Sequence, residues 1–315
     1  MSDVAALLGA VLFAAYGGEA FLKGILGAAL HLRIPKAVAA TTLAAFATSS
    51  PELTVSSIAA LRGHPEIGLG DALGSNVVNI ALIFGLALLF GAIRVTRSEF
   101  RRDFILALTI PLLTFVFALD GRIGRVEGTM LLVLFTIWIF FSVRDALHHR
   151  KHEPEPGASD GARSRITTVL LGVSGLAALV VAGRLFVAGA TGIANTLQID
   201  PYVIGVLVVA IGTSLPELVT VLLSRLRGHD DVGVGTLIGS NLFNGLAIVG
   251  VAASIHPIAV PSAEVTVTLA CGAASLLLLV PNREGLISRS RGLALLTLYF
   301  VFVWATLAYG SWPPI

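Results

Sequence analysis

The sequence contains few charged residues. Asp, Glu, Lys and Arg make up 13% of the 315 residues, whereas 56% are hydrophobic, and the mean hydropathy is +0.90. A soluble domain carries about 25% charged residues, which keep its surface in water. The shortage therefore excludes an ordinary soluble domain and indicates a chain embedded in lipid.

Net charge and cysteine are scarce as well. A formal net charge of +2 gives no support for a nucleic-acid partner. The single cysteine, Cys271, excludes an internal disulfide and lies in an apolar run, where we expect it only to pack. The N-terminus lacks a basic region followed by a short apolar segment and a cleavage site. Residues 5–32 are therefore expected to form a spanning helix rather than a removable signal.

Long apolar runs are what the sequence has in abundance. A helix needs about 20 such residues to cross the hydrocarbon core. Ten runs meet or approach that length: 5–32, 37–61, 72–93, 104–119, 126–143, 166–195, 202–224, 232–255, 263–281 and 293–310. The fold class expected is an all-α membrane protein with ten transmembrane helices, the fourth of them short enough to be tilted or partly interfacial.

Lys and Arg are distributed unevenly between the two sets of connections. One set holds Arg33, Lys36, Arg94, Arg97, Arg101, Arg102, Arg144, Arg150, Lys151, Arg163, Arg165, Arg225, Arg227, Arg283, Arg289 and Arg291; the other holds only Arg62, Arg122 and Arg125. Basic connections stay in the cytoplasm. This predicts a multi-pass protein of the plasma (inner) membrane, with both termini outside.

The longest polar stretch, 144–165, is rich in charge, Pro and Gly, which suits a mobile linker. We expect it to be cytoplasmic and to join two five-helix units, 1–143 and 166–315. Its three histidines within 148–152 could bind a metal or sense pH, although a solvated basic linker is the simpler interpretation.

An internal repeat relates the two halves. Residues 46–85 align with 211–250 without a gap, at a constant offset of 165. The matched positions include Thr48 and Thr213, Pro51 and Pro216, Glu52 and Glu217, Gly74-Ser75-Asn76 and Gly239-Ser240-Asn241, and Asn79 and Asn244. The copies are an odd number of spans apart, so they enter the membrane from opposite sides. Such inverted repeats are typical of secondary transporters, which bind their substrate near the midplane where the repeats meet.

Glu52 and Glu217 lie near the middle of apolar runs, where a charged side chain costs about 2.5–3.5 kcal/mol on insertion scales. Each follows a proline, which removes an N–H and predicts a kinked or unwound helix. Freed carbonyls and the neighbouring hydroxyls are hard oxygen ligands beside a carboxylate, as Ca²⁺ prefers. In each half a Ser and an Asn four residues apart on one helix face add further oxygens, Ser75 with Asn79 and Ser240 with Asn244. Gly70, Gly74, Gly235 and Gly239 predict close helix approach beside them.

These motifs, TSSPE at 48–52 and TSLPE at 213–217, each followed by GSNxxN, resemble the two alpha-repeats of the Na⁺/Ca²⁺ exchanger branch of the Ca²⁺/cation antiporter superfamily. The similarity covers the ten-span layout and is strongest over 45–91 and 210–256. It implies an antiporter with Ca²⁺ and Na⁺ as transported ions, the lipid bilayer as its surroundings, no cofactor and no enzymatic activity. The ligands implied are Thr48, Ser49, Glu52, Ser75, Asn79, Thr213, Ser214, Glu217, Ser240 and Asn244, with the backbone carbonyls of Ala45 and Ala210.

Two further expectations follow from the resemblance. Many exchangers of this branch have Asp where this chain has Asn244, so the cluster should carry two carboxylates, which match one Ca²⁺ or two Na⁺. The first and sixth helices of the family form a mobile pair. Here they carry Glu19 and Arg184 at the same offset of 165, and these could pair with each other, with Lys23, or reach an interface.

Other functions stay open at this point. A proton-coupled Ca²⁺ antiporter of the same superfamily is the nearest alternative, although the hydroxyls of the two TSxPE motifs suit Na⁺. An intramembrane enzyme using Glu52 and Glu217 as acid and base would need a nucleophile–His pair or an HExxH motif, and the sequence offers neither. A sensor or assembly scaffold without transport is the third alternative.

Overall fold

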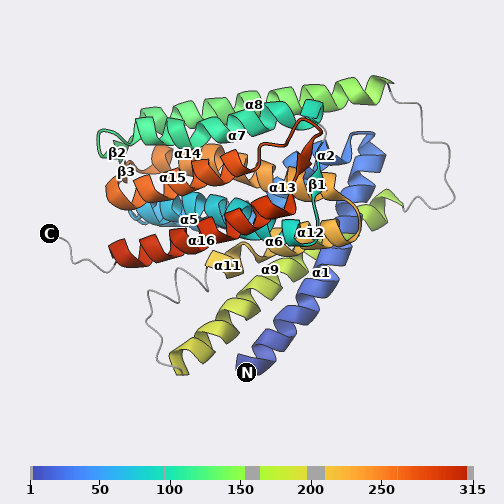
Figure 1. Ribbon diagram of the computed structural model, residues 1–315, viewed down its shortest axis with the longest axis horizontal. Helices are drawn as coiled ribbons and strands as arrows, with labels where there is room; N and C mark the ends of the chain where they lie inside the picture. The colour runs from blue at the N-terminus through green and yellow to red at the C-terminus, as the bar shows by residue number, and fades with distance from the viewer. Residues whose placement is uncertain (1–2, 96, 153–163, 197–209, 261, 311–315) are drawn as a thin grey trace.

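The computed structural model describes the backbone of residues 3–95, 97–152, 164–196, 210–260 and 262–310, which is almost entirely helical (Figure 1). The first half contains α1 (Asp3–Leu32), α2 (Lys36–Ala39), η1 (Ala40–Ala44), α3 (Ala45–Thr48), α4 (Ser50–Leu61), α5 (Pro65–Val77), η2 (Val78–Phe84), α6 (Gly85–Leu89), β1 (Ile93–Arg94), α7 (Arg97–Phe117), β2 (Arg122–Ile123) and α8 (Arg125–His152). The second contains α9 (Arg165–Thr196), α11 (Ala210–Thr213), α12 (Leu215–Leu226), α13 (Asp230–Leu242), η4 (Phe243–Ile248), α14 (Val249–Ile255), β3 (Ile258–Ala259), α15 (Ser262–Leu278), β4 (Leu286–Ile287) and α16 (Arg289–Gly310). The η elements are π-helical turns that continue the helix on either side.

Six helical stretches in the described part of the chain are long and apolar enough to cross a membrane. They are Asp3–Leu32, Pro65–Leu89, Arg125–His148, Arg165–Ala190, Asp230–Ile255 and Arg289–Ala308. Two shorter apolar helices, Lys36–Thr48 and Val265–Leu278, fall within two other expected spans. Most of the expected span 202–224 is α11 and α12, and the remainder lies outside the described residues. The chain is thus an integral membrane protein with at least these six spans.

The same series of elements recurs in both halves. α3, α4 and α5 have the same lengths as α11, α12 and α13 and begin 165 residues earlier, and β1 likewise precedes β3. β1 pairs antiparallel with β4, and β2 pairs antiparallel with β3. Each strand of the first half therefore pairs with a strand of the second, so the halves are joined in the same way at two places.

α1 and α9 form a pair that crosses obliquely beside the other helices (Figure 1). Glycines bring the two backbones together: a Cβ added at Gly24 would lie 2.5 Å from the Cα of Gly172, and one at Gly175 would lie 2.3 Å from the backbone N of Phe21. Small residues allow such close packing where lipid provides no hydrophobic drive for association. Any larger side chain at these glycines would force the pair apart.

One expectation needs correction, and another is tested in one half only. The stretch 144–152, expected as the start of the linker, continues α8 as helix to His152, because no proline or glycine interrupts it before Pro154. Gly235 and Gly239 do meet η1 and its neighbours closely, but no described residue lies within 4 Å of a Cβ built at Gly70 or Gly74. The residues at the matching positions for the first half, 202–206, lie outside the described residues, so close approach at Gly70 and Gly74 stays a prediction.

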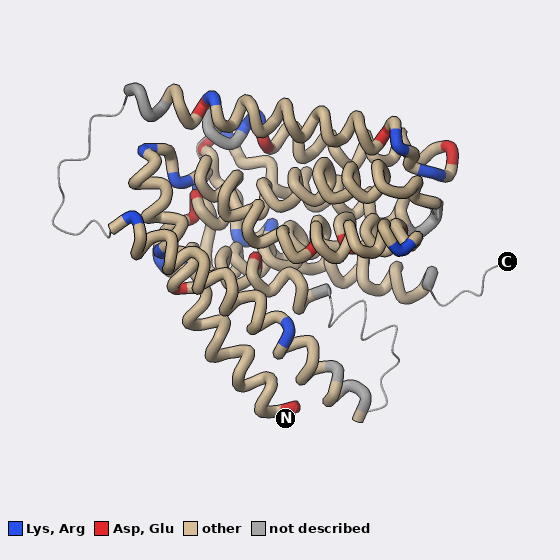
Figure 2. The backbone as a smooth tube through the Cα atoms, turned by 180° about the vertical axis from the view of Figure 1, so that it is seen from behind, with Lys and Arg blue, Asp and Glu red and all other residues tan. Residues whose placement is uncertain are grey.

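The distribution of charge follows the long axis of the bundle. Figure 2 shows Lys and Arg gathered at the end from which the linker leaves, with few at the opposite end. This is the arrangement that the sequence asymmetry requires, since both sets of connections must lie at opposite ends. Which end faces the cytoplasm stays a prediction.

Candidate functional site

The two predicted proline breaks occur where expected. α3 ends at Thr48 and α4 begins at Ser50, with Ser49 between them at φ −88° and ψ 3°. Ser214 interrupts α11 and α12 in the same way, at φ −84° and ψ 10°. Because Pro51 has no N–H, the carbonyl of Ala47 accepts instead from the Ser50 hydroxyl, at 2.8 Å. Each break places a glutamate in the first turn of the following helix.

These breaks bury a set of polar side chains from both halves. Thr48, Ser49, Glu52, Ser75, Asn79, Ser214, Glu217, Ser240 and Asn244 are each at most 4% exposed. Thr213 is half-buried, and Ala45 and Ala210 lie at the first residues of α3 and α11. Burying so many polar groups is unfavourable unless they find partners.

Contacts across the repeat bring part of this set together around Glu217. Its Oε1 accepts from the hydroxyls of Ser240 at 3.4 Å and Ser49 at 3.5 Å, and the hydroxyls of Thr48 and Ser240 lie 3.4 Å apart. Thr48 and Ser49 come from the first half, whereas Glu217 and Ser240 come from the second. Side chains that are 168 positions apart thus meet at the Glu217 carboxylate, and hydroxyls that are 192 positions apart meet beside it.

Several oxygens of the same set have no partner among the described residues. These are Glu52 Oε2, Glu217 Oε2, Asn79 Oδ1, Asn244 Oδ1 and the Ser214 hydroxyl. Buried polar atoms nearly always have a partner, so a group of orphaned oxygens calls for a ligand. Carboxylate, amide and hydroxyl oxygens suit a hard cation such as Ca²⁺ or Na⁺.

Two asparagines at the centre of the repeat, Asn76 and Asn241, were recognised from the sequence only as matched positions, without a role in the site. The Asn76 amide donates to the carbonyl of Asn241 at 3.2 Å, and the Asn241 amide donates back to the carbonyl of Asn76 at 3.3 Å. Asn241 Oδ1 also accepts from Asn79 Nδ2 at 3.2 Å, which leaves the oxygen of Asn79 as its free atom. The constant offset of 165 between them was the available signal.

Sequence reasoning missed a carboxylate on α5. Asp71 lies one turn before Ser75 and close enough to Glu52 for its charge to act on that carboxylate. Its four-residue spacing from Ser75 could have identified it, because residues four apart share a helix face.

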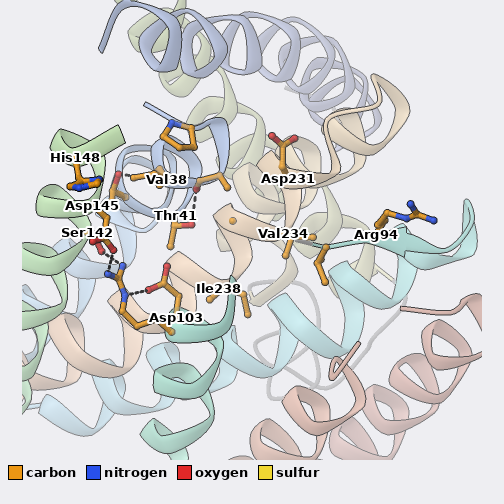
Figure 3. A pocket seen from close by; sticks show the side chains of 16 residues that line it. Val38, Thr41, Arg94, Asp103, Ser142, Asp145, His148, Asp231, Val234 and Ile238 are labelled. Atoms are coloured by element: carbon orange, nitrogen blue, oxygen red, sulfur yellow. Dashed lines mark hydrogen bonds and ion pairs between the residues drawn. The ribbon is translucent and has the colours of Figure 1, made fainter. Parts of the chain in front are cut away.

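A separate pocket of about 360 Å³ opens at the end of the bundle from which the linker leaves (Figure 3). Its lining comes from α2, η1, α7, α8 and α13 and includes Thr41, Asp103, Asp145, Asp231 and Gly235, but neither glutamate of the buried set. Close contacts border this pocket: a Cβ added at Gly239, one turn beyond Gly235, would lie 2.1 Å from the Thr41 carbonyl oxygen. η1 and α13 are therefore packed together between the pocket and the buried oxygens.

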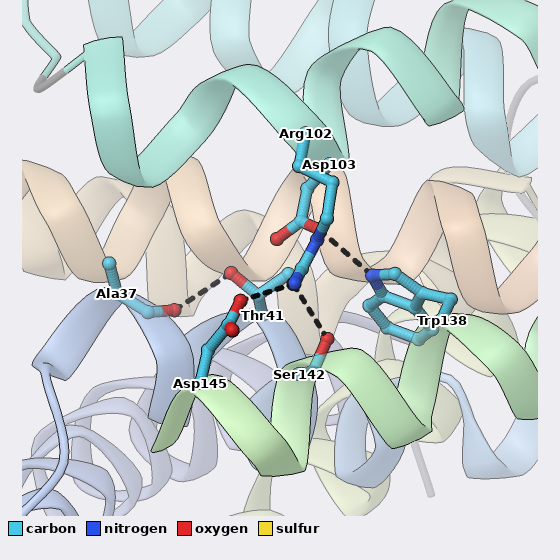
Figure 4. A network of polar contacts seen from close by, with 7 residues as sticks. All are labelled: Ala37, Thr41, Arg102, Asp103, Trp138, Ser142 and Asp145. Atoms are coloured by element: carbon cyan, nitrogen blue, oxygen red, sulfur yellow. Dashed lines mark hydrogen bonds and ion pairs between the residues drawn. The ribbon is translucent and has the colours of Figure 1, made fainter. Parts of the chain in front are cut away.

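A polar network holds one wall of this pocket (Figure 4). Arg102 on α7 pairs with Asp145 on α8, donates to the Ser142 hydroxyl at 3.0 Å, and lies 3.1 Å from the carboxylate of Asp103. Trp138 Nε1 donates to that carboxylate at 3.0 Å. The network therefore ties α7 to α8.

The open alternatives for Glu19 are resolved by its contacts. Glu19 pairs with Lys23 at 2.8 Å and with Arg227, which follows α12, at 2.7 Å. The suggested pairing of Glu19 with Arg184 is wrong, and Arg184 forms no ion pair within the described residues. Arg184 is exposed on α9. The constant offset places Glu19 and Arg184 at equivalent positions of opposite halves, which does not make them neighbours.

Comparison with known proteins places these features in a family. The sequence model of the sodium/calcium exchanger protein family matches residues 2–144 and 167–308. The putative antiporter CaxA of Alkalimonas amylolytica is 34% identical over 262 residues, covering 82% of each chain. An uncharacterised membrane protein of Methanocaldococcus jannaschii, MJ0091, is 31% identical over 304 residues, covering 96% of this chain and 97% of its own.

A solved structure agrees with this similarity over nearly the whole chain. The sodium–calcium exchanger NCX_Mj, soaked with Na⁺ and Sr²⁺, superimposes with a TM-score of 0.82 at 28% identity, covering 99% of both chains. The sodium/calcium exchanger MaX1 of Methanosarcina acetivorans is 28% identical over 339 residues. With the family model matching both halves, this integral membrane protein belongs to the sodium/calcium exchanger protein family.

Proposed function

We propose that the chain is a secondary active antiporter that exchanges Ca²⁺ for Na⁺ across the inner membrane. In this proposal it has ten spans, arranged as two inverted five-helix repeats, 1–143 and 166–315. The cations bind where Thr48, Ser49 and Glu52 of one repeat approach Ser214, Glu217 and Ser240 of the other. Both termini lie outside, and the 144–165 linker is cytoplasmic.

One observation carries this proposal: a buried set of oxygens, drawn from both halves, in which both glutamates retain an oxygen that has no partner among the described residues. Burying two carboxylates without counter-charge is very costly. A bound cation removes that cost by supplying the missing positive charge and the missing partners. The carbonyls of Ala45 and Ala210 stand beside the proline breaks and are proposed to complete the shell.

Exchange requires that the site meet one side of the membrane at a time. In this proposal, the close packing of η1 against α13 closes the route from the pocket to the cluster. We propose that these two elements separate when the site opens to the cytoplasm, and that the α1–α9 pair moves with them. Because one site serves both ions, each must leave before the other enters, which couples their fluxes.

The test is Ca²⁺ flux in liposomes that contain the purified protein. Uptake driven by an outward Na⁺ gradient, and abolished when choline replaces Na⁺, is the expected result. Uptake that follows a pH gradient and ignores Na⁺ would replace the proposal with proton-coupled antiport. No Ca²⁺ flux under either gradient would reject Ca²⁺ antiport.

A further inference from the structure

Asp71 lies on the same helix face as two members of the buried set. It precedes Ser75 by four residues and Asn79 by eight, along α5 and its continuation η2. Side chains four apart are neighbours on a helix surface. With a rise of about 1.5 Å per residue, Asp71 is about 9 Å along the helix from its start at Pro65, and Ser75 is about 6 Å deeper. Asp71 thus stands between that helix end and the buried set.

This carboxylate has no hydrogen bond or ion pair in the described part of the chain, and it is only half-buried. A carboxylate inside a membrane-spanning segment is costly, so such residues usually mark ion pathways. Glu52 is within electrostatic reach of Asp71, and the Oε2 of Glu52 is buried with no partner among the described residues. A cation near Asp71 would therefore feel both negative charges.

The glycines beside Asp71 have no close neighbour among the described residues. Gly70 precedes it and Gly74 follows it by three residues, and no described residue lies within 4 Å of a Cβ built at either. In the second half the equivalent glycines, Gly235 and Gly239, press against backbone carbonyls of α2 and η1. Gly70 and Gly74 lie on the side of the bundle predicted to face outward, and no described residue contacts the helix at their positions.

We propose that Asp71 is a cation-binding residue of the outward path, which attracts Ca²⁺ or Na⁺ from outside and passes it one turn deeper to Ser75 and Glu52. The proposal rests on the antiport function above and adds a third carboxylate to the two identified from sequence. Attraction of an ion by a charged cleft raises its local concentration and its rate of entry.

The second half has no equivalent of this charge. Thr236 occupies the matching position, is fully buried, and donates its hydroxyl to the Val232 carbonyl at 2.9 Å. Entry from the cytoplasm therefore lacks this carboxylate. Removing Asp71 should affect transport from the outer face and leave entry from the inner face nearly unchanged.

The experiment measures Ca²⁺ uptake in right-side-out and in inverted membrane vesicles. Asp71→Asn should raise the KM for Ca²⁺ about threefold to tenfold at the outer face, where one carboxylate is lost along the path. At the inner face it should change KM by less than about twofold. The outer effect should shrink at high choline chloride, because added salt screens a partly exposed charge.

Glu66→Gln is the matched control. Glu66 is on the same helix but exposed, and its carboxylate lies 3.3 Å from His64. Glu66→Gln also removes one negative charge, but at a position outside the helix face that carries Asp71 and Ser75. The KM for Ca²⁺ at the outer face should therefore stay within about twofold of wild type. Asp71→Glu, which keeps the charge, should do the same.

The proposal would be overturned if the KM of Asp71→Asn for Ca²⁺ at the outer face stayed within twofold of wild type. It would also be overturned if Glu66→Gln raised this KM as much as Asp71→Asn does. Should Asp71→Asn fail to insert, Asp71→Thr installs the residue of the other half and is read in the same way. If wild type carries no Ca²⁺, the antiport proposal fails separately. Thermal stabilisation of the purified protein by Ca²⁺ or Na⁺ then tests Asp71, and equal stabilisation of wild type and Asp71→Asn would reject its role.

Discussion

The two halves share their elements and motifs but differ in the charges placed on their oblique helices. On α1, Glu19 pairs with Arg227, which follows α12. The repeat equivalent of Glu19 is Arg184 on α9, and the equivalent of Arg227 is Arg62, which follows α4. The equivalent pair therefore consists of two cations. A contact that is attractive in one half would be repulsive in its counterpart. The repeated architecture therefore need not give the outward-facing and inward-facing conformations equal free energies.

Within the buried set the halves also differ in how their ligands are held. Glu217 Oε1 accepts from two hydroxyls, whereas Asn79 is oriented through Asn241. Ser50 satisfies the carbonyl freed by Pro51, but Leu215 stands at the matching position and has no hydroxyl for this purpose. The following experiments break or sharpen these differences.

The largest effect on transport is expected at the two glutamates, where the two halves should contribute equally. Glu52→Gln and Glu217→Gln keep the shape of the side chain but remove one negative charge from a buried, low-dielectric site. Loss of one partner of a buried charge pair costs about 3–5 kcal/mol, so each should lower Na⁺-driven Ca²⁺ uptake about a hundredfold or more. Uptake in liposomes is measured after matching the amounts of inserted protein. Near-normal flux in either variant would show that the site depends on only one half.

A smaller effect is expected at Asn244, whose counterpart is Asn79. Asn244→Asp adds a carboxyl group to the buried cluster, where like charges at short distance cannot all ionise. The new group should hold a proton in part of the cycle, so exchange by the variant should vary more between about pH 6 and 8 than wild-type exchange. The extra charge should also strengthen dependence on membrane potential, if it admits another Na⁺.

Na⁺-driven Ca²⁺ flux at several pH values, with the potential clamped by K⁺ and valinomycin, measures both properties. Asn79→Asp makes the same change in the other half and serves as the comparison. Identical pH and voltage profiles for Asn244→Asp and wild type would place Asn244 outside the ion cluster.

Next in size is the difference between Asn76 and Asn241. Asn76→Ala and Asn241→Ala each remove one of the two reciprocal amide–carbonyl bonds, but only Asn241→Ala also releases the Asn79 amide. A hydrogen bond contributes about 1 kcal/mol, so Asn241→Ala should raise the KM for Ca²⁺ about fivefold relative to Asn76→Ala.

A double-mutant cycle with Asn79→Ala separates positioning from general stability. In the Asn79→Ala background, Asn241→Ala should add no more than Asn76→Ala does, because only the reciprocal bond is left for either change to remove. Additive changes in KM for both pairs would mean that Asn241 contributes only to packing.

These examples show what could be predicted from the sequence. The proline breaks and the two repeated motifs could be recognised from local sequence, and they identified Glu52, Glu217, Ser240 and Thr48. In the structure, Thr48 of the first half contacts Ser240 of the second, which in turn donates to Glu217. Contacts such as Asn241 with Asn79, or Gly24 with Gly172, depend on how two helices approach each other, which neither spacing nor hydropathy determines. The ten-span arrangement and the ligand roles stay predictions, since length and apolarity identify six spans.

The smallest effect is expected at the oblique helices. In an inverted repeat, the conformation of one half in one state becomes that of the other half in the opposite state. The opposite state would therefore bring Arg184 toward Arg62, and their repulsion should favour the state in which Glu19 pairs with Arg227. Arg184→Glu would make both contacts attractive and weaken this preference. Glu19 is 31% exposed and Arg227 56%, and exposed pairs contribute about 0–1 kcal/mol, so the expected shift is about twofold to fivefold.

A shift between two states changes apparent affinity on the two faces in opposite directions. The KM for Ca²⁺ in right-side-out and inverted vesicles should therefore move oppositely in Arg184→Glu, and move back when Arg62→Gln removes its new partner. Arg184→Gln, which removes the repulsion without adding attraction, should give an intermediate value. A KM that moves in the same direction on both faces would mean that Arg184 acts on ion binding itself, because a change in the balance of states cannot weaken or strengthen both faces together.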